Sequence, residues 1–408
     1  MTRIKKEQLE FLDWEFGVFF HFGIRTFYEG HKDWDMLEMN PDRFNPEMLN
    51  CEQWISTVKQ AGAKYAILVC KHHDGFANWP SAYTEYSVKN TPWKNGTGDV
   101  VKEFTDACRK YDLKIGLYYS PAQFGSDKVD NYDDYFINQI SELLTNYGKI
   151  DYLWFDGCGS EGHEYDTKRI ISVIRSLQPA ILIFNMWDPD TRWVGNEAGI
   201  APMPNHSLVN ALDFSVLTDE KQAIGEEKFL PAECDCRIRL SNWFYSDNDA
   251  DTIKDVNELM GLYYYSVGRG ANLLLNIAPD RRGLLPDADC QALLAFGKKV
   301  KQTFSNKLAN LSNAQRVSNT YSFTFATPTL VNHFVLEEEL ESGERITEFS
   351  IYISPYPKGE KIFVYKGYTV GHKHICQIPT VATCQVDIVI ETETAPHVMK
   401  EISVYHAR

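Results

Sequence analysis

The stretch Leu153-Trp154-Phe155-Asp156-Gly157 decides the fold of this chain. An apolar run that opens at Ile150 ends on a single carboxylate, and a glycine follows at once. A buried strand that delivers an Asp at its carboxyl end and then turns is how α/β barrels present catalytic groups. The stretch therefore predicts a barrel strand that places Asp156 at the mouth of a site.

Three further apolar runs lead into polar or titratable residues in the same manner. They are Phe16–Phe20 before His21, Tyr65–Cys70 before Lys71-His72-His73-Asp74-Gly75, and Ile115–Tyr119 before Ser120. The parallel strands of one barrel bring their carboxyl ends to the same face. We therefore expect the residues at the ends of these four strands to form one shared site.

Strand and helix patterns alternate to about residue 300, which is typical of parallel strands joined by helices. Gln53–Ala61 shows helical spacing, Asp99 is placed to cap a second helix, and Met186–Ser215 reads as a long loop. We predict a (β/α)8-type barrel, possibly irregular, over residues 1–308. An open doubly wound sheet is the alternative, but the glycine-rich phosphate loop expected after its first strand is missing from the sequence.

Beyond residue 310 the pattern changes to the period of two that is typical of strands. Phe349, Ile351 and Ile353 alternate with polar residues, and turn residues such as Ser342-Gly343 separate such segments. We predict an accessory all-β sandwich over residues 309–408.

Composition narrows the function classes. The formal net charge of −15 over 408 residues disfavours a nucleic-acid partner, which would need clustered Lys and Arg. No run approaches the roughly 18 apolar residues of a membrane span, so we expect no membrane partner. Nine scattered cysteines and a polar, basic Met1–Glu10 favour a cytoplasmic protein with reduced thiols, unless a signal peptide has been removed. Oligomeric state is not predicted.

Asp156 is the first candidate for chemistry. An Asp at a strand end is sometimes only a helix cap, whereas the functional interpretation is a carboxylate nucleophile screened from water by Trp154. A glycosidase needs a second carboxyl group that can donate a proton. Glu197, in a glycine-flanked loop, and Glu233, placed near a later strand end, are the two candidates.

The segment His72-His73-Asp74 has two interpretations, a metal site or hydrogen bonds to ligand hydroxyls. Neighbouring strand residues point to opposite faces, so a single ion rarely takes both histidines, and we expect no metal. We expect His21 and Asp33-Trp34 to line the same site as the two histidines. Gly268-Arg269-Gly270 precedes a strand rather than opening a helix, which excludes a phosphate loop.

Taken together, the barrel motifs resemble those of the glycoside hydrolase family 29 α-L-fucosidases. The resemblance rests on Phe16–Gly23, Ala61–Tyr65, Lys71–Phe76, Gly116–Ser120 and Trp154–Gly157. It implies a retaining exo-α-L-fucosidase that needs no cofactor, acts on a fucosylated oligosaccharide or glycoconjugate, and uses Asp156 as nucleophile. The fucose contacts that we expect are His21, Asp33, Trp34, His72, His73, Tyr118, Trp154 and Glu233, where Asp33 stands in place of the family's Glu.

Further segments resemble the branch of that family that prefers α-1,3 and α-1,4 linked fucose. They are Arg192–Gly199, Pro231–Asp235 and Asn272–Ile277. In that branch the acid/base is the Glu of Gly-Asn-Glu-Ala-Gly, which implies Glu197, and the accessory domain is a galactose-binding-like sandwich. The alternative hypothesis is a catalytically impaired fucose- or glycan-binding protein on the same barrel, because Asp33 and the segment Pro202–Ser207 depart from the family pattern.

Overall fold

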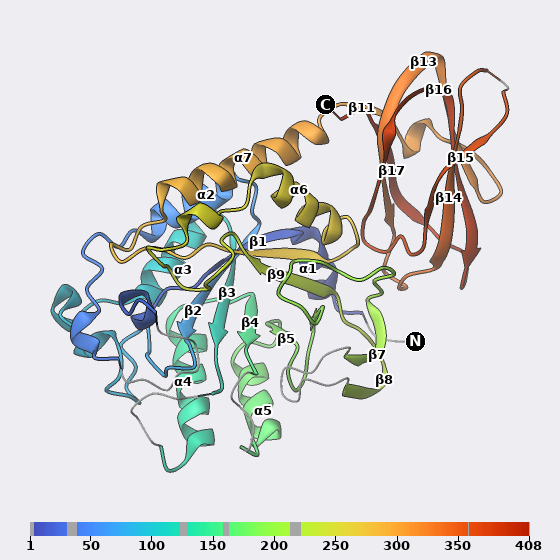
Figure 1. The fold of residues 1–408 in the computed structure, drawn as a ribbon. Coiled ribbons are helices and arrows are strands. Elements are labelled where there is room, and N and C mark those ends of the chain that lie inside the picture. Colours follow the sequence, from blue (N-terminus) through green and yellow to red (C-terminus); the bar gives the residue numbers. More distant parts are fainter. Residues whose placement is uncertain are drawn as a thin grey trace.

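The computed structural model describes residues 4–30, 39–122, 129–157, 163–212, 222–357 and 359–407. Within these ranges, eight parallel strands form the first sheet, in the spatial order β5-β4-β3-β2-β1-β10-β9-β6 (Figure 1). They are β1 (Phe16–Phe20), β2 (Tyr65–Lys71), β3 (Lys114–Tyr119), β4 (Tyr152–Phe155), β5 (Leu182–Phe184), β6 (Arg192–Trp193), β9 (Ala232–Arg237) and β10 (Asn272–Asn276). A parallel bridge from Phe184 to Thr191 brings the two ends of this sheet together, so the barrel is nearly closed.

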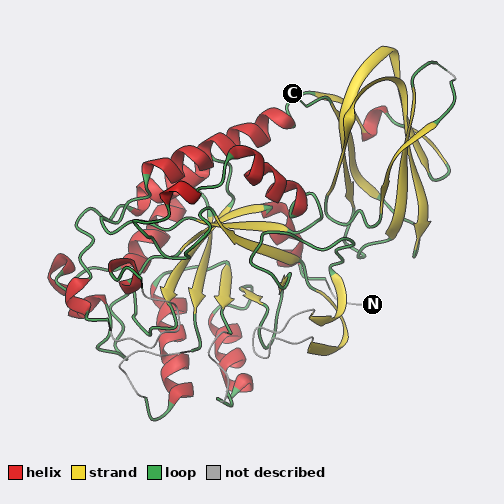
Figure 2. Ribbon diagram, in the orientation of Figure 1, coloured by secondary structure: helices red, strands yellow, loops and turns green. Residues whose placement is uncertain are grey.

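Helices cover the outside of the strands, as Figure 2 shows. They are α1 (Lys6–Trp14), α2 (Cys51–Gln60), α3 (Val100–Lys110), α4 (Tyr132–Asn146), α5 (Thr167–Leu177), α6 (Val256–Tyr265) and α7 (Asp287–Thr303). Local sequence explains their starts: Asp99 accepts a hydrogen bond from the backbone N–H of Lys102 at 2.9 Å and so caps α3. The predicted barrel is confirmed.

The long loop predicted for Met186–Ser215 is wrong in part, because two strands lie within it. One is β6, and the other is β7 (Leu208–Leu212), which forms a hairpin with β8 (Gln222–Phe229). Strand β6 has only two residues, which pair with Ala232 and Glu233 of β9. A strand of two residues has no periodicity that a sequence pattern can reveal.

The C-terminal sandwich (residues 307–405) is antiparallel and lies against the barrel at the ends of α6 and α7 (Figure 1). Its strands are β11 (Lys307–Asn310), β12 (Gln315–Val317), β13 (Thr320–Glu338), β14 (Ile346–Ser354), β15 (Ile362–Gly367), β16 (His374–Glu393) and β17 (Met399–Tyr405). Register shifts interrupt the long strands β13 and β16 near their middles. Around a separate apolar core, the sheet folds over itself. This confirms the predicted all-β unit.

None of the helices in the described ranges is both long enough and apolar enough to cross a lipid bilayer. The eight cysteines in those ranges are all free thiols, and most of them are buried.

Candidate active site

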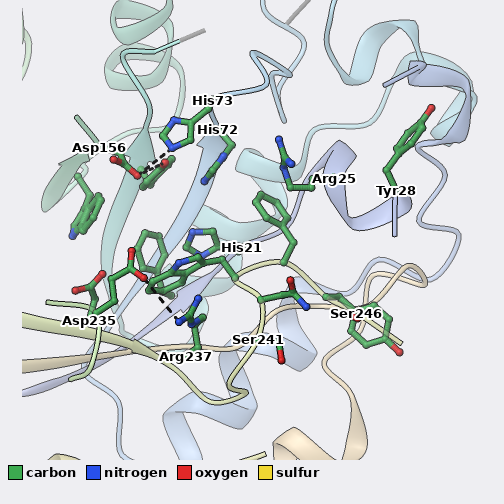
Figure 3. Close-up of a pocket in the computed structure, with 18 of the residues that line it drawn as sticks. His21, Arg25, Tyr28, His72, His73, Asp156, Asp235, Arg237, Ser241 and Ser246 are labelled. Atoms are coloured by element: carbon green, nitrogen blue, oxygen red, sulfur yellow. Dashed lines mark hydrogen bonds and ion pairs between the residues drawn. The ribbon is translucent and has the colours of Figure 1, made fainter. Parts of the chain in front are cut away.

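A cavity of about 540 Å³ opens at the carboxyl ends of the barrel strands (Figure 3). Residues expected from the sequence to form one site do line this one cavity: His21, His72, His73, Tyr118, Trp154, Asp156 and Glu197. Asp33 and Trp34, which were also expected here, lie outside the described residues. The strand ends thus gather the candidate groups as parallel barrel topology requires.

Asp156 directly follows β4, and a quarter of its side chain is exposed. The Tyr118 hydroxyl donates a hydrogen bond to its Oδ2 at 2.8 Å, and Nε2 of His73 lies 3.7 Å from the same oxygen. His73 is in turn held by a 2.6 Å contact between its Nδ1 and the Ser120 hydroxyl. A carboxylate fixed from two sides at a cavity wall is suited to nucleophilic attack.

His21 and His72 are buried and electrically neutral near pH 7. Burial lowers the pKa of His21 to about 3, although the contact of its Nδ1 with the Asn276 amide oxygen, 2.7 Å away, opposes this shift. Burial also lowers the pKa of His72 well below its usual range, and the neighbouring His73 adds to the shift. A neutral imidazole donates one hydrogen bond and accepts another, which suits sugar hydroxyls.

Stacked aromatic rings form the apolar wall of the cavity. The ring of Tyr118 stacks on His72 and on Trp154, with centroids 5.5 and 5.4 Å apart, and Trp154 stacks on Phe184 at 4.1 Å. The edge of Phe19 meets Trp154 from another side. Such a rigid aromatic wall offers a flat surface to the apolar face of a pyranose ring.

Glu197 lies at the tip of a tight turn after β6. The Asn196 side chain closes this turn, because it accepts from the Ala198 N–H at 3.0 Å and donates to the Ile200 carbonyl at 2.9 Å. Gly195 and Gly199 flank it with φ angles of 87° and 74°, which L-residues with a side chain rarely adopt. The Glu197 carboxylate is about half exposed and lies 4.0 Å from the Arg237 guanidinium.

Glu233 does not line the cavity, although we expected it to contact substrate. It is the second residue of β9 rather than a residue near the strand's end, and it is fully buried. Tyr65, Tyr152 and the Trp154 indole donate hydrogen bonds to its carboxyl oxygens at 2.6, 3.3 and 2.9 Å. Through its hydrogen bond with the Trp154 indole, Glu233 thus supports the aromatic wall from below the cavity.

We expect Glu233→Gln to change how stability depends on pH. Burial raises the pKa of Glu233 from 4.5 to about 7, so the folded state binds this proton more tightly than the unfolded state. The stability that protonated Glu233 adds to the folded state is fully present below pH 4.5 and is lost as the pH rises to 7. The loss in the free energy of unfolding is on the order of 3 kcal/mol in total. Denaturant unfolding from pH 5 to 8 should show the Gln variant gaining stability relative to wild type. A difference that does not vary with pH would contradict the prediction.

Two polar residues of β9, Asp235 and Arg237, also line the cavity and were not predicted as site residues. Figure 3 shows them on the side of the cavity opposite His72, His73 and Asp156. Asp235 accepts from the Trp193 indole at 2.6 Å, and burial raises its pKa well above the usual range. The sequence signal was the alternation Glu-Cys-Asp-Cys-Arg over residues 233–237, which places the three polar side chains on one face.

One group of potential metal ligands occurs among the described residues. It consists of His72, His73 and Asp156, whose ligand atoms all lie within 4.8 Å of one another. Asp74, which the sequence placed beside the two histidines, is not in this group: it accepts from the Phe76 N–H at 2.8 Å and lies 3.8 Å from Arg25.

We expect dialysis against EDTA to leave turnover of a fucoside unchanged. A cation bound to this group would occupy Asp156 and would prevent the attack on substrate that the sequence resemblance implies for this carboxylate. Initial rates before and after dialysis, with buffer-only dialysis as the control, test this. A loss of activity that Zn²⁺ restores would show that a metal takes part instead.

The chain is similar to known fucosidases along its whole length. A family model described as alpha-L-fucosidase matches residues 2–303. Alpha-L-fucosidase 1 of Arabidopsis thaliana is 34% identical over 410 residues, which cover 89% of this chain and 80% of that protein.

Solved structures agree with this result. A glycoside hydrolase 29 family member from an unknown rumen bacterium is 34% identical with a TM-score of 0.91, covering 100% of this chain and 78% of the other. A Ruminococcus gnavus GH29 fucosidase in complex with fucose is 26% identical with a TM-score of 0.86, covering 100% and 95%. The chain therefore belongs to the α-L-fucosidase family of glycoside hydrolases, family 29.

Proposed function

We propose that this protein is a retaining exo-α-L-fucosidase that removes terminal α-1,3 or α-1,4 linked fucose from glycans. The proposal rests on the position of Asp156. Tyr118 and His73 hold its carboxylate in the cavity that Glu197 also lines. Family membership supports the activity, and the Ruminococcus gnavus relative in complex with fucose supports a fucosylated glycan as substrate.

Each residue then has a defined role. Asp156 attacks the anomeric carbon and forms a covalent fucosyl-enzyme, while Glu197 protonates the departing glycosidic oxygen. In the second step Glu197 takes a proton from water, which attacks the same carbon and releases fucose with retained configuration. The neutral rings of His21 and His72 bind hydroxyls, and the wall formed by Tyr118 and Trp154 contacts the ring.

Hydrolysis of para-nitrophenyl α-L-fucoside beside a Lewis-type trisaccharide and an α-1,2 fucosylated trisaccharide tests the activity and the linkage together. We expect release of fucose from the aryl fucoside and the Lewis-type glycan, with slower release from the α-1,2 glycan. Equal rates on both glycans would contradict the linkage preference alone. Binding of fucose with no hydrolysis of any substrate would favour the impaired binding protein.

Methanol added to the reaction tests the stereochemistry. A fucosyl-enzyme attacked by methanol gives methyl α-L-fucoside, whereas a single inverting displacement gives the β anomer. Proton NMR of the earliest product distinguishes the two anomers. The β anomer as first product would rule out the retaining mechanism.

A further inference from the structure

The segment that carries Glu197, residues 194–207 and here called the acid/base loop, connects β6 to β7. Its tip is closed by local hydrogen bonds of Asn196, but those bonds do not attach it to the barrel. Gly199 lies so close to β9 that a Cβ atom there would meet the Cys236 sulfur at 2.8 Å. Glu197 itself lies 4.0 Å from Arg237 of β9, and the position of its carboxylate also depends on what holds the rest of the loop.

Arg269 is the first anchor of this loop. Its guanidinium donates to the Ala201 carbonyl at 2.6 Å, and its own carbonyl accepts from the Asn205 amide at 2.9 Å. The Ala201 N–H donates to the Tyr265 carbonyl at 2.8 Å, and the Tyr265 ring lies 4.2 Å below the guanidinium. One arginine thus grips the loop at two points, four and eight residues beyond Glu197.

The turn that presents Arg269 is itself attached to the C-terminal sandwich. The Ile375 N–H of β16 donates to the Gly268 carbonyl at 3.0 Å, and Arg269 forms an antiparallel bridge with His374. A short piece of sheet therefore joins the barrel to β16 directly below the arginine.

A sandwich residue, Glu344, provides the second anchor and contacts the acid/base loop directly. Its Oε1 accepts from the Ser207 N–H at 2.8 Å, and its Oε2 lies 3.4 Å from Nδ1 of His206. The Glu344 side chain is only 7% exposed, and the hydrogen bond to it raises the pKa of His206. Gly343 packs so closely against Leu208 of β7 that a Cβ atom at residue 343 would lie 2.9 Å from the Leu208 side chain.

We propose that the C-terminal sandwich is a positioning element of the active site, and that Arg269 and Glu344 hold the acid/base loop so that Glu197 meets the glycosidic oxygen. This rests on the role of Glu197 given under Proposed function. Ordering a loop costs conformational entropy, and a general acid displaced by about 1 Å can lose about 10²-fold in rate. Glu344 on the sandwich, and Arg269 on a barrel turn that pairs with β16 of the sandwich, meet that cost before substrate binds.

Arg269→Ala, Glu344→Ala and Glu344→Gln test the proposal, with Lys400→Ala as the matched control. Lys400 pairs with Asp13 of α1 at 3.0 Å, so its loss removes a sandwich–barrel contact that does not involve the loop. Rates are measured on a natural fucosylated trisaccharide, whose leaving group needs a proton, and on an aryl fucoside with a highly acidic phenol, which does not.

We expect Arg269→Ala and Glu344→Ala to lower kcat/KM on the trisaccharide by about 10- to 100-fold. The value of kcat/KM on the aryl fucoside should change little, because it reports the first step, in which that leaving group needs no proton. Glu344→Gln keeps an acceptor for the Ser207 N–H and should be milder than Glu344→Ala. Lys400→Ala should match wild type, and thermal unfolding should show that every variant is folded.

Folded Arg269→Ala and Glu344→Ala variants that hydrolyse the trisaccharide at the wild-type rate would overturn the proposal. An equal loss on both substrates would also overturn it, since that pattern reports damage to the whole barrel. Glu197→Ala, assayed in parallel, separates the two levels. If Glu197→Ala loses activity on the trisaccharide alone while the anchor variants keep theirs, the anchoring proposal is wrong and the role of Glu197 stands. If Glu197→Ala keeps its activity on both substrates, the anchoring proposal and the role of Glu197 both fail.

Discussion

Asp156→Asn is expected to lower turnover of para-nitrophenyl α-L-fucoside by about 10⁴-fold or more, because the amide cannot form the fucosyl-enzyme. Asn has nearly the same volume, and its carbonyl oxygen can accept the Tyr118 hydroxyl, which lies 2.8 Å from Oδ2 in the native chain. The loss should therefore fall on kcat while fucose still binds. Initial rates and calorimetric titration with fucose measure the two quantities.

Two controls sharpen this experiment. Thermal unfolding of Asp156→Asn and Asp156→Gly should show intact folding, since the native side chain is already a quarter exposed. A 2-deoxy-2-fluoro fucosyl fluoride should label native protein on the peptide that contains Asp156 and should leave both variants unlabelled. A label on another carboxylate, or near-native turnover by Asp156→Asn, would transfer the nucleophile role elsewhere.

Much of the barrel could be predicted because its strands are buried, uninterrupted and bounded by clear signals. Strand β1 coincides with the apolar run Phe16–Phe20, and Asp99 caps its helix as expected. Candidate site residues at strand ends could be found by the same logic, since parallel topology brings carboxyl ends together whatever the details of packing.

The depth of Glu233 could not be predicted, because it depends on where strand β9 begins. Residues 233, 235 and 237 point to the same face, so each lies about two residues higher in the barrel than the one before. Glu233 consequently lies under Trp154, while Asp235 and Arg237 reach the cavity. Placing β9 two residues earlier along the chain makes Glu233 look like a strand-end residue.

The anchors of the acid/base loop were beyond sequence reasoning for another reason. Arg269 and Glu344 lie 72 and 147 residues beyond Glu197 in the chain, and one of them belongs to another domain. The pattern Gly268-Arg269-Gly270 was visible, but its meaning depends on contacts with Ala201 and β16 that tertiary packing alone creates.

Glu197→Ala is expected to lower turnover of a natural fucosylated trisaccharide by about 10²- to 10⁴-fold, the usual contribution of general acid–base catalysis. The loss on an aryl fucoside with an acidic phenol should be much smaller, because that leaving group departs without a proton. Parallel measurement of kcat/KM on the two substrates gives the ratio that reports acid catalysis.

Azide provides the second readout for Glu197→Ala. On the aryl fucoside the first step stays fast, but without the carboxylate water has no base to activate it, so the fucosyl-enzyme accumulates. Azide, a small anion that enters the vacated space and needs no base, should partly restore the rate on this substrate as fucosyl azide forms. The side chain is about half exposed at the cavity mouth, so azide can reach its place. Glu233→Ala is the decisive comparison, because its carboxyl group is buried under Trp154. Its removal leaves the Tyr65 hydroxyl and the Trp154 indole without an acceptor, at about 1–3 kcal/mol each, while the Tyr152 hydroxyl keeps its 2.8 Å hydrogen bond with Thr191. That variant should lose stability without azide rescue, and rescue of Glu233→Ala in place of Glu197→Ala would reverse the assignment of the two glutamates.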